Sequence, residues 1–322
     1  MFGLTFLSAT SKTTTHRVVP FTFGQTMGNP VGGYVAGGFA ALVAGIDKIA
    51  FAADTKTTLV ATLTSARAYG AGFANSAIAG YSAGGNNSST KFSGIDKIAF
   101  PADTKTTLSA TLTTARTESA GFANSGTAGY VTGGFDTGLI SGIEKITFVS
   151  DTRTTLSATL TTARNVTTDF ANSGVAGYAA GGDSGAGGSH NNIDKIAFPA
   201  DTKTTLSATL TANRQSGAGF ANSGTAGYVA GGYFGGYING IDKIAFPADT
   251  KTTLSATLTT ATAGAAGFAN SGVAGYVAGG DDGASISRID KIAFAADTKT
   301  TLVATLTSAR TGSQAFADSG TL

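Results

Sequence analysis

The sequence repeats one six-residue motif, Gly-Tyr-Val-Ala-Gly-Gly, at nearly constant intervals. The motif first occurs at residues 33–38, and its Gly-Tyr pair returns five more times, with spacings of 47, 49, 48, 50 and 48 residues. Self-similarity at such a period is typical of propellers and solenoids, in which one supersecondary unit buries its apolar faces against copies of itself. The repeat therefore limits the fold to one of these two architectures.

Each unit contains four short extended segments, and residues 120–164 serve as the example. The segments lie at 122–124, 130–132, 143–148 and 155–161, and no window of a dozen residues has helical spacing. In the last segment Leu156, Ala158 and Leu160 share one face, which is the alternation expected of a strand. The first two segments are rich in small residues and the last two in large ones, as a tapering wedge requires. We predict an all-β fold, a six-bladed β-propeller of four-stranded antiparallel blades.

The repeat divides the chain into an N-terminal extension, residues 1–31, and a propeller, residues 32–322. The units begin with a second strand, and the chain ends with a first-strand segment around Phe316. We therefore expect the C-terminal strand to close the ring, with residues 21–23 as the alternative source of that strand. The extension itself is either a loosely packed leader or an anchor whose residues 18–23 pair with a neighbouring chain.

The composition excludes several classes of function. Charged residues make up only 12% of the chain and recur in register to a net charge of +2, so no basic footprint for nucleic acid is present. The absence of Cys excludes disulfides and thiolate metal sites. No run of 18 apolar residues occurs, so we expect no membrane span. No basic region precedes the short apolar run at the start, so we expect no signal peptide.

The sequence offers no catalytic, metal or cofactor site. With His16 and His190 as the only histidines and no Cys, a catalytic triad or a three-His zinc site cannot form. Asp281-Asp282-Gly283 could contact Ca²⁺, but a solvated loop is the preferred interpretation. An Asp recurs in the turn before each fourth strand, where its side chain is expected to accept from backbone amides two residues on. These aspartates are Asp54, Asp103, Asp151, Asp201, Asp249 and Asp297.

The connections fall into a constant set and a variable set. Those joining first to second strands and third to fourth strands hardly change, whereas those joining second to third strands vary between seven and ten residues. The connections that follow the fourth strands also vary. In an up-and-down blade both variable sets emerge on the same face of the disc, where a rigid scaffold normally carries recognition. Relaxed constraint on exposed loops is the alternative explanation.

An aromatic cluster at Tyr233, Phe234 and Tyr237 is the strongest binding candidate on that face. Three aromatic rings in five residues supply flat apolar area with polar tips, which suits sugar rings or a protein hot spot. The alternative is that these rings fold back onto the blade. The candidate ligand-binding residues are Tyr233, Phe234, Tyr237, Asn239, Phe39, Asn86, Asn87, Phe135, Asp136, His190, Asn191, Asn192, Asp281 and Asp282.

The units resemble kelch repeats. The likeness rests on a small-residue strand, the Tyr and diglycine of residues 227–232, a variable loop, a strand ending in Asp-Thr, and an Arg before the next unit. It implies the propeller fold. One departure is that kelch units carry a Trp early in the fourth strand, where this chain has Leu59, Leu108, Leu156, Leu206, Leu254 and Leu302. A second is Thr262, which stands where the other units have Arg67, Arg116, Arg164, Arg214 and Arg310.

The near-identical units also resemble kelch-type repeat proteins of tailed-bacteriophage virions. This likeness implies a non-enzymatic structural or adhesive virion protein, such as a tail fibre, spike or decoration subunit, made in the host cytoplasm. Residues 1–31 would then contact other virion or assembly subunits, and the variable face a host surface glycan or a neighbouring subunit. The alternatives are an intracellular kelch-type protein-interaction scaffold and a cryptic carbohydrate-active enzyme.

Overall fold

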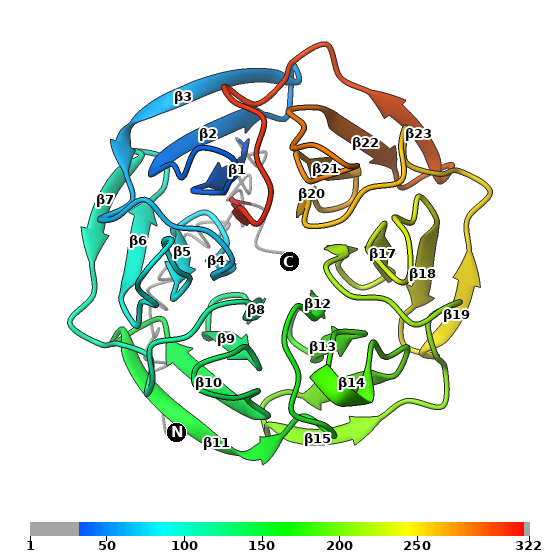
Figure 1. Cartoon of the computed structure of the whole chain (residues 1–322), viewed down its shortest axis with the longest axis horizontal. Coiled ribbons are helices and arrows are strands. Elements are labelled where there is room, and N and C mark those ends of the chain that lie inside the picture. Colours follow the sequence, from blue (N-terminus) through cyan, green and yellow to red (C-terminus); the bar gives the residue numbers. More distant parts are fainter. Residues whose placement is uncertain (1–31, 319–322) are drawn as a thin grey trace, which may run out of the picture.

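The structure is a computed structural model and describes residues 32–318. In this part of the chain, 24 strands form six four-stranded antiparallel sheets. Figure 1 shows these sheets as blades arranged around a central axis, each beside its neighbour around the whole ring. The prediction of an all-β, six-bladed propeller is confirmed.

The four strands of each blade, from the axis to the rim, are named a, b, c and d. Strands a are β24 (Gln314–Ala317), β4 (Ala71–Asn75), β8 (Ala120–Asn124), β12 (Thr168–Asn172), β16 (Ala218–Asn222) and β20 (Ala266–Asn270). Strands b are β1 (Gly32–Ala36), β5 (Ala79–Ala83), β9 (Ala128–Thr132), β13 (Ala176–Ala180), β17 (Ala226–Ala230) and β21 (Ala274–Ala278). Strands c are β2 (Gly45–Ala50), β6 (Ile95–Ala99), β10 (Gly142–Thr147), β14 (Ile193–Ala197), β18 (Ile241–Ala245) and β22 (Ile289–Ala293). Strands d are β3 (Thr55–Thr62), β7 (Thr104–Thr107), β11 (Thr152–Thr159), β15 (Thr202–Thr205), β19 (Thr250–Thr253) and β23 (Thr298–Thr301).

Blade 1 joins the two ends of the described chain. It consists of β24, β1, β2 and β3, and blades 2 to 6 follow in chain order. Strand β24 pairs antiparallel with β1, from Gly33 opposite Ala317 to Ala36 opposite Gln314. The prediction that the C-terminal strand closes the ring is confirmed. The alternative strand, residues 21–23, lies outside the described residues, and β24 occupies the inner edge of β1.

The predicted strand boundaries were partly wrong. In the example unit, strand d covers Thr152–Thr159 instead of 155–161, because Thr152 already pairs with Thr147 directly after the turn. Strand a begins at Ala120, two residues before its predicted start. In four of the six blades the two residues before the Phe are Ala and Gly, and they belong to the innermost strand, where close approach of neighbouring backbones leaves little room for side chains.

The Gly of the Gly-Tyr pair in strand b is explained by a Phe side chain of the preceding blade that packs on it. A Cβ atom at Gly80 would lie 2.0 Å from the ring of Phe316, which belongs to blade 1. Phe316 stacks on Tyr34 of its own blade, and Tyr34 stacks on Phe100 of blade 2, with ring centroids 5.4 and 4.8 Å apart. The same three-ring stack recurs at the other five junctions. Each stacked pair adds about 0.5–1.5 kcal/mol beyond area burial, so the motif ties neighbouring blades together.

The turn aspartates have a different partner from the one predicted. The carboxylate of Asp103 accepts from the hydroxyl of Tyr34 at 2.7 Å and from Lys48 Nζ at 2.8 Å, both in the preceding blade. The other five turn aspartates bind the corresponding Tyr and Lys. The structural role was predicted correctly, but the bond to local amides was not, because a Lys within reach offers a stronger, charge-assisted bond.

A second set of inter-blade bonds joins the residue that follows strand d of one blade to strand c of the next. Arg164, which follows strand d of blade 3, donates to Asp194 in strand c of blade 4 at 3.0 Å, and both side chains are fully buried. After strand d of blade 5, Thr262 stands in the position of the Arg, and Arg288 of blade 6 approaches Asp290 at 3.8 Å instead. The other buried pairs are Arg67–Asp96, Arg116–Glu144, Arg214–Asp242 and Arg310–Asp47.

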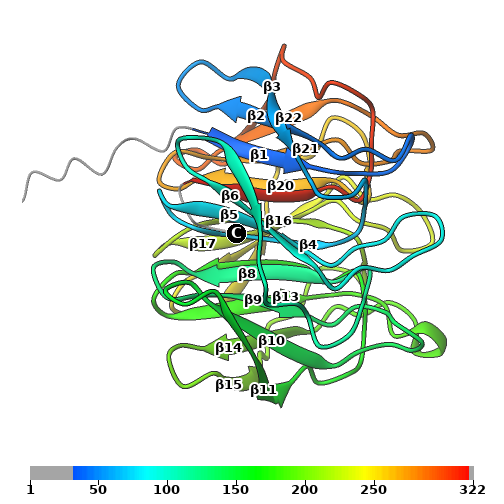
Figure 2. The same ribbon diagram turned by 90° about the vertical axis from the view of Figure 1, so that its left-hand side faces the viewer.

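The two faces of the disc carry different connections, as Figure 2 shows from the side. The a–b and c–d turns lie on one face, called the constant face, and the b–c loops and d–a connections on the opposite face, called the variable face. Gly32 and Asp318 meet on the constant face, where the Asp318 amide donates to the Gly32 carbonyl at 3.1 Å. Within residues 32–318, no helix is long and apolar enough to cross a membrane. The predicted extension, residues 1–31, lies outside the described residues.

Candidate binding face

The bases of the variable loops are fixed by paired backbone bonds. The first residue after each diglycine forms an antiparallel bridge with the preceding d–a connection, so that Phe39 pairs with Thr311 and Tyr233 with Gln215. The other bridges join Asn86 to Ala68, Phe135 to Thr117, Asp183 to Asn165 and Asp281 to Ala263. The prediction that both variable sets lie on one face is confirmed, and their contact makes that face continuous around the ring.

A closed ring of six backbone hydrogen bonds surrounds the axis on this face. One residue of each d–a connection donates its amide to the carbonyl of the equivalent residue one blade earlier, with distances of 2.5 to 2.9 Å. All six residues have positive φ, between 45° and 63°. This conformation is uncommon for a bulky side chain and persists only where the surroundings impose it. The six residues are Tyr69, Glu118, Val166, Ser216, Gly264 and Gly312.

The aromatic loop of blade 5 projects into solvent. Tyr233, Phe234 and Tyr237 are 38, 52 and 38% exposed, so all three side chains stay partly accessible on the variable face. The rings of Tyr233 and Tyr237 meet edge to face, with centroids 5.4 Å apart and planes at 78°. Asn239 of the same loop is exposed, and its carbonyl accepts from the Leu258 amide, which anchors the end of the loop.

The structure brings Asp281 of blade 6 to this aromatic loop. The Tyr237 hydroxyl donates to Asp281, whose carboxylate also accepts from the Gly283 amide at 3.0 Å. The hydrogen bond to Asp281 raises the pKa of Tyr237. Asp282 does not converge on the same point, because its carboxylate accepts from Thr260 at 2.9 Å. The predicted acidic pair is therefore split between two partners.

A cavity of about 230 Å³ opens between these loops and Tyr69. Its polar walls come from Gln215, Ser216, Asp281 and Thr311. Burial, and then the charge of Glu118, raise the pKa of Tyr69. Tyr69 was missed by sequence reasoning because it is a lone aromatic residue in a short connection, with no signal that the connection ends at the axis.

A second hollow, of about 210 Å³, lies between blades 1 and 2. Phe39, which is 46% exposed, lines it together with Tyr69, Asn86 and Asn87. Both asparagines also serve the loop itself: Asn86 Oδ1 accepts from the Thr117 hydroxyl, and Asn87 Oδ1 accepts from two amides of its own turn. Both asparagine side chains thus also stabilise the conformation of the loops.

Phe135 and Asp136 of blade 3 meet a cation from blade 2. Lys91 Nζ lies 4.5 Å from the centroid of the Phe135 ring, a cation–π geometry. The same ammonium donates to the Asp136 carbonyl oxygen. This contact could not be predicted from the sequence, because Lys91 belongs to the loop of another blade.

His190 and the two following asparagines support the long loop of blade 4. His190 Nε2 lies 2.8 Å from the Ser184 hydroxyl, beside the short 3₁₀ helix η1 (Gly185–Gly187). Burial, and then the charge of Arg164, lower the pKa of His190. Asn192 Oδ1 accepts from Arg164 at 2.7 Å, and the Asn191 carbonyl accepts from the Leu210 amide. The two asparagines have bonds that fix the loop to the blade.

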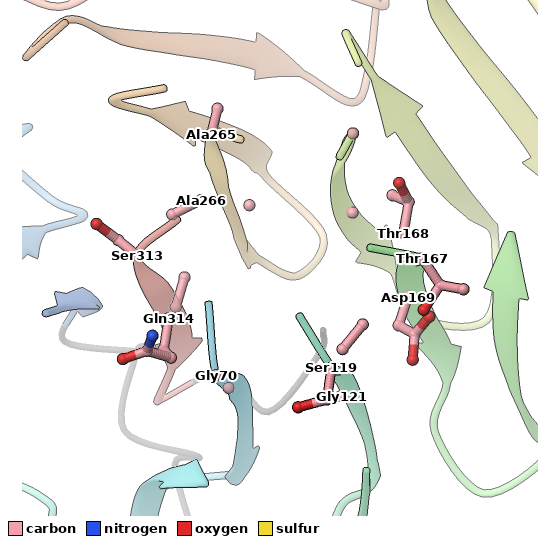
Figure 3. Close-up of a pocket in the computed structure, with 16 residues that line it drawn as sticks. Gly70, Ser119, Gly121, Thr167, Thr168, Asp169, Ala265, Ala266, Ser313 and Gln314 are labelled. Carbon is pink, nitrogen blue, oxygen red and sulfur yellow. The ribbon is translucent and has the colours of Figure 1, made fainter. Parts of the chain in front are cut away.

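The axis of the disc holds a narrow polar cavity of about 120 Å³, drawn in Figure 3. Ser119, Thr167, Asp169 and Gln314 contribute side chains to it. Asp169 replaces the Gly or Ala of the other five blades, is buried, and accepts from the Thr132 hydroxyl at 2.6 Å. Burial raises the pKa of Asp169 to about 7. Asp169 was not predicted from the sequence as a candidate residue.

Among residues 32–318, no group of three or more His, Asp or Glu side chains converges in a way that could hold a metal ion. Comparison of the sequence with protein-family models and with curated proteins finds no match. The side chains that do gather are aromatic, hydroxyl, amide and carboxylate groups at the Tyr233–Asp281–Tyr69 cavity, which is called the tyrosine cavity below. Such a set can stack on a ligand and accept its hydrogen bonds.

Proposed function

We propose that this protein is a non-enzymatic adhesive or structural protein that presents its variable face to a target. The observation that carries the proposal is the segregation of the two faces. The connections that vary most between blades lie on one side, and the point where residues 1–31 join the propeller, Gly32, lies on the other. An attachment through the constant face would leave the whole variable face free for recognition.

The exposed aromatic rings favour recognition over a purely structural role. Phe39, Tyr233, Phe234 and Tyr237 project from loops whose backbone is held by the inter-loop bridges, so little order has to be gained on binding. Aromatic rings with polar tips are the side chains that carry most binding energy in protein and sugar recognition. A host surface glycan or a neighbouring subunit is the target that fits these loops.

We further propose that the chain is a kelch-type propeller of a tailed-bacteriophage virion. The diglycine after strand b, the Arg after strand d and the near-identity of the six units support the kelch resemblance. Leu108, in the position of the kelch Trp, packs partly buried against the core between blades 2 and 3, so a smaller apolar residue can fill this place. Regular copies of one wedge suit a particle component whose task is to be rigid.

A glycan array probed with the full-length protein tests the adhesive role. We expect binding to a defined glycan, and at least a tenfold loss when Tyr233, Phe234 and Tyr237 are all replaced by Ala. The matched control replaces Ile78, Val175 and Val273, three exposed apolar residues of the constant face, by Ala and should bind as before. Binding that survives the first variant, or is lost in the second, would contradict the proposal, and turnover of a bound polysaccharide would support the enzyme alternative.

A further inference from the structure

The tyrosine cavity is assembled from six separate segments of chain. Tyr69, Gln215–Ser216, Ala263–Gly264 and Thr311 come from four successive d–a connections, and Tyr237 and Asp281 from two loops. A segment from each of the four connections also takes part in the hydrogen-bonded ring or its bridges. The walls of the cavity are therefore fixed by the closed ring of the propeller and not by any one flexible loop.

Tyr69 is held in the cavity wall at a cost in backbone conformation. Its φ is +58°, a value that Gly264 and Gly312 adopt without strain at the equivalent positions. A Cβ atom at Gly312 would lie 2.5 Å from the Tyr69 ring, so glycine at 312 makes room for this ring. The same positive φ recurs at all six positions of the hydrogen-bonded ring, so the closed ring of the propeller fixes the position of Tyr69 in the cavity wall.

The polar groups of the cavity are suited to hydroxyl partners. Asp281 supplies carboxylate oxygens, and one of them is already oriented by the Tyr237 hydroxyl and the Gly283 amide. Ser216, Thr311 and Gln215 add groups that can both donate and accept. The perpendicular rings of Tyr233 and Tyr237 supply a flat face and an edge beside them.

The charge of the cavity excludes anionic ligands. Asp281 forms no salt bridge within residues 32–318, and no Lys, Arg or His lines the cavity. After strand d of blade 5 the position of the buried inter-blade arginine is taken by Thr262, and Arg288 of blade 6 is directed to Asp290 instead. A ligand carboxylate would therefore stand next to Asp281 without a cation to pair with it.

We propose that the tyrosine cavity binds one uncharged pyranose residue, stacked on Tyr233 or Tyr237, with its hydroxyls bonded to Asp281. A cavity of about 230 Å³ admits a single sugar ring and little more. The inference rests on the proposed adhesive function, since it identifies the sugar class that the variable face recognises. It predicts that neutral glycans are bound and that glycans ending in uronic or sialic acid are not.

Two isosteric variants of neighbouring residues test the site. The full-length protein is titrated with methyl glycosides of neutral hexoses and, separately, of glucuronic and sialic acids, with binding followed by ligand-observed NMR. We expect Asp281→Asn to weaken binding of the neutral glycoside at least tenfold. Asp282→Asn is the matched control, because that carboxylate bonds to Thr260 and does not line the cavity.

The outcomes separate the inference from the function on which it rests. If the intact protein binds glycans on the array but Asp281→Asn binds the neutral glycoside as tightly as the wild type, or the acidic glycosides bind better, the inference is wrong and adhesion elsewhere on the face stands. If no glycan binds the intact protein, the proposed glycan adhesion fails as well. Thermal melts of both variants should match the wild type, since Asp281 and Asp282 lie on a loop above the framework.

Discussion

The two faces of the disc use the same pair of groups, a Tyr hydroxyl and an Asp carboxylate, for different ends. On the constant face Tyr34 donates to Asp103 of the next blade, and Lys48 completes a contact that recurs at every junction. On the variable face Tyr237 donates to Asp281, again across a junction, but this contact occurs in one place, between an exposed Tyr and a half-buried Asp. Of these two contacts, the one that recurs holds the blades together, and the one that occurs once is not needed for the fold.

The largest expected effect concerns one of the buried Arg–Asp pairs between blades, which belong to the framework, that is, the contacts that recur at the blade junctions. Replacing Arg164 by Met removes the buried cation of Asp194 and leaves only the more distant Lys203, 3.8 Å away, so we expect a loss of about 3 kcal/mol in the free energy of unfolding. Lys91→Met is the control on the variable face, where loss of the contact with Phe135 should cost less than about 1 kcal/mol. Denaturant unfolding measures both, and equal losses in the two variants would contradict the distinction between framework and loops.

Asp169, a buried residue between blades that departs from the repeat, is expected to make the free energy of unfolding depend on pH. Because burial raises the pKa of Asp169 to about 7 from an ordinary value of 3.8, the folded state holds a proton that the unfolded state has lost between these values. Stability should therefore fall as the pH rises from about 4 to about 7, by an amount on the order of 4 kcal/mol, and level off above.

The Asn variant provides the reference for that measurement. Asp169→Asn cannot ionise, so the difference in unfolding free energy between it and the wild type should grow through this pH range. Arg164 is the cation whose charge acts on Asp169, and it stays ionised throughout the range. A constant difference from pH 4 to pH 8 would show that Asp169 does not titrate in the folded protein.

The smallest of the three expected effects concerns glycine. Gly80→Ala places a methyl group against the Phe316 ring, and such overpacking typically costs about 1–3 kcal/mol. Gly236→Ala lies on the exposed aromatic loop, where an added Cβ meets no atom within 4 Å, and should leave stability unchanged. Melting temperatures compare the two; a Gly80 variant as stable as the Gly236 variant would mean that the aromatic stack can move aside.

The propeller could be predicted from the sequence because the information for it is local and repeated. The alternation around Leu156 and the recurring diglycine lie within one unit, so they indicate strands and turns without knowledge of distant partners. Closure by the last strand followed from counting segments, since a first strand near Phe316 had no second strand after it. These inferences depend only on the order of elements along the chain.

The partners of individual side chains could not be predicted in the same way. Asp103 was assigned to its own turn because its true donors, Tyr34 and Lys48, lie 69 and 55 residues away and reach it only across the junction between two blades. Tyr69 joins the tyrosine cavity because every d–a connection ends at the axis, which brings it beside Tyr233 from blade 5. Sequence reasoning identified Tyr233, Tyr237 and Asp281 but had no means to pair them.

The position of Gly32 also determines how the molecule would bear tension. Residues 1–31 join the disc at the start of β1 on the constant face, and a ligand held on the variable face would pull in the opposite direction, along the strands. Such a pull loads the ladders from β1 to β24 and from β1 to β2 in shear, so that their hydrogen bonds resist together and do not open one by one. Blade 1, which closes the ring, is therefore also the blade through which a tethered propeller would transmit force.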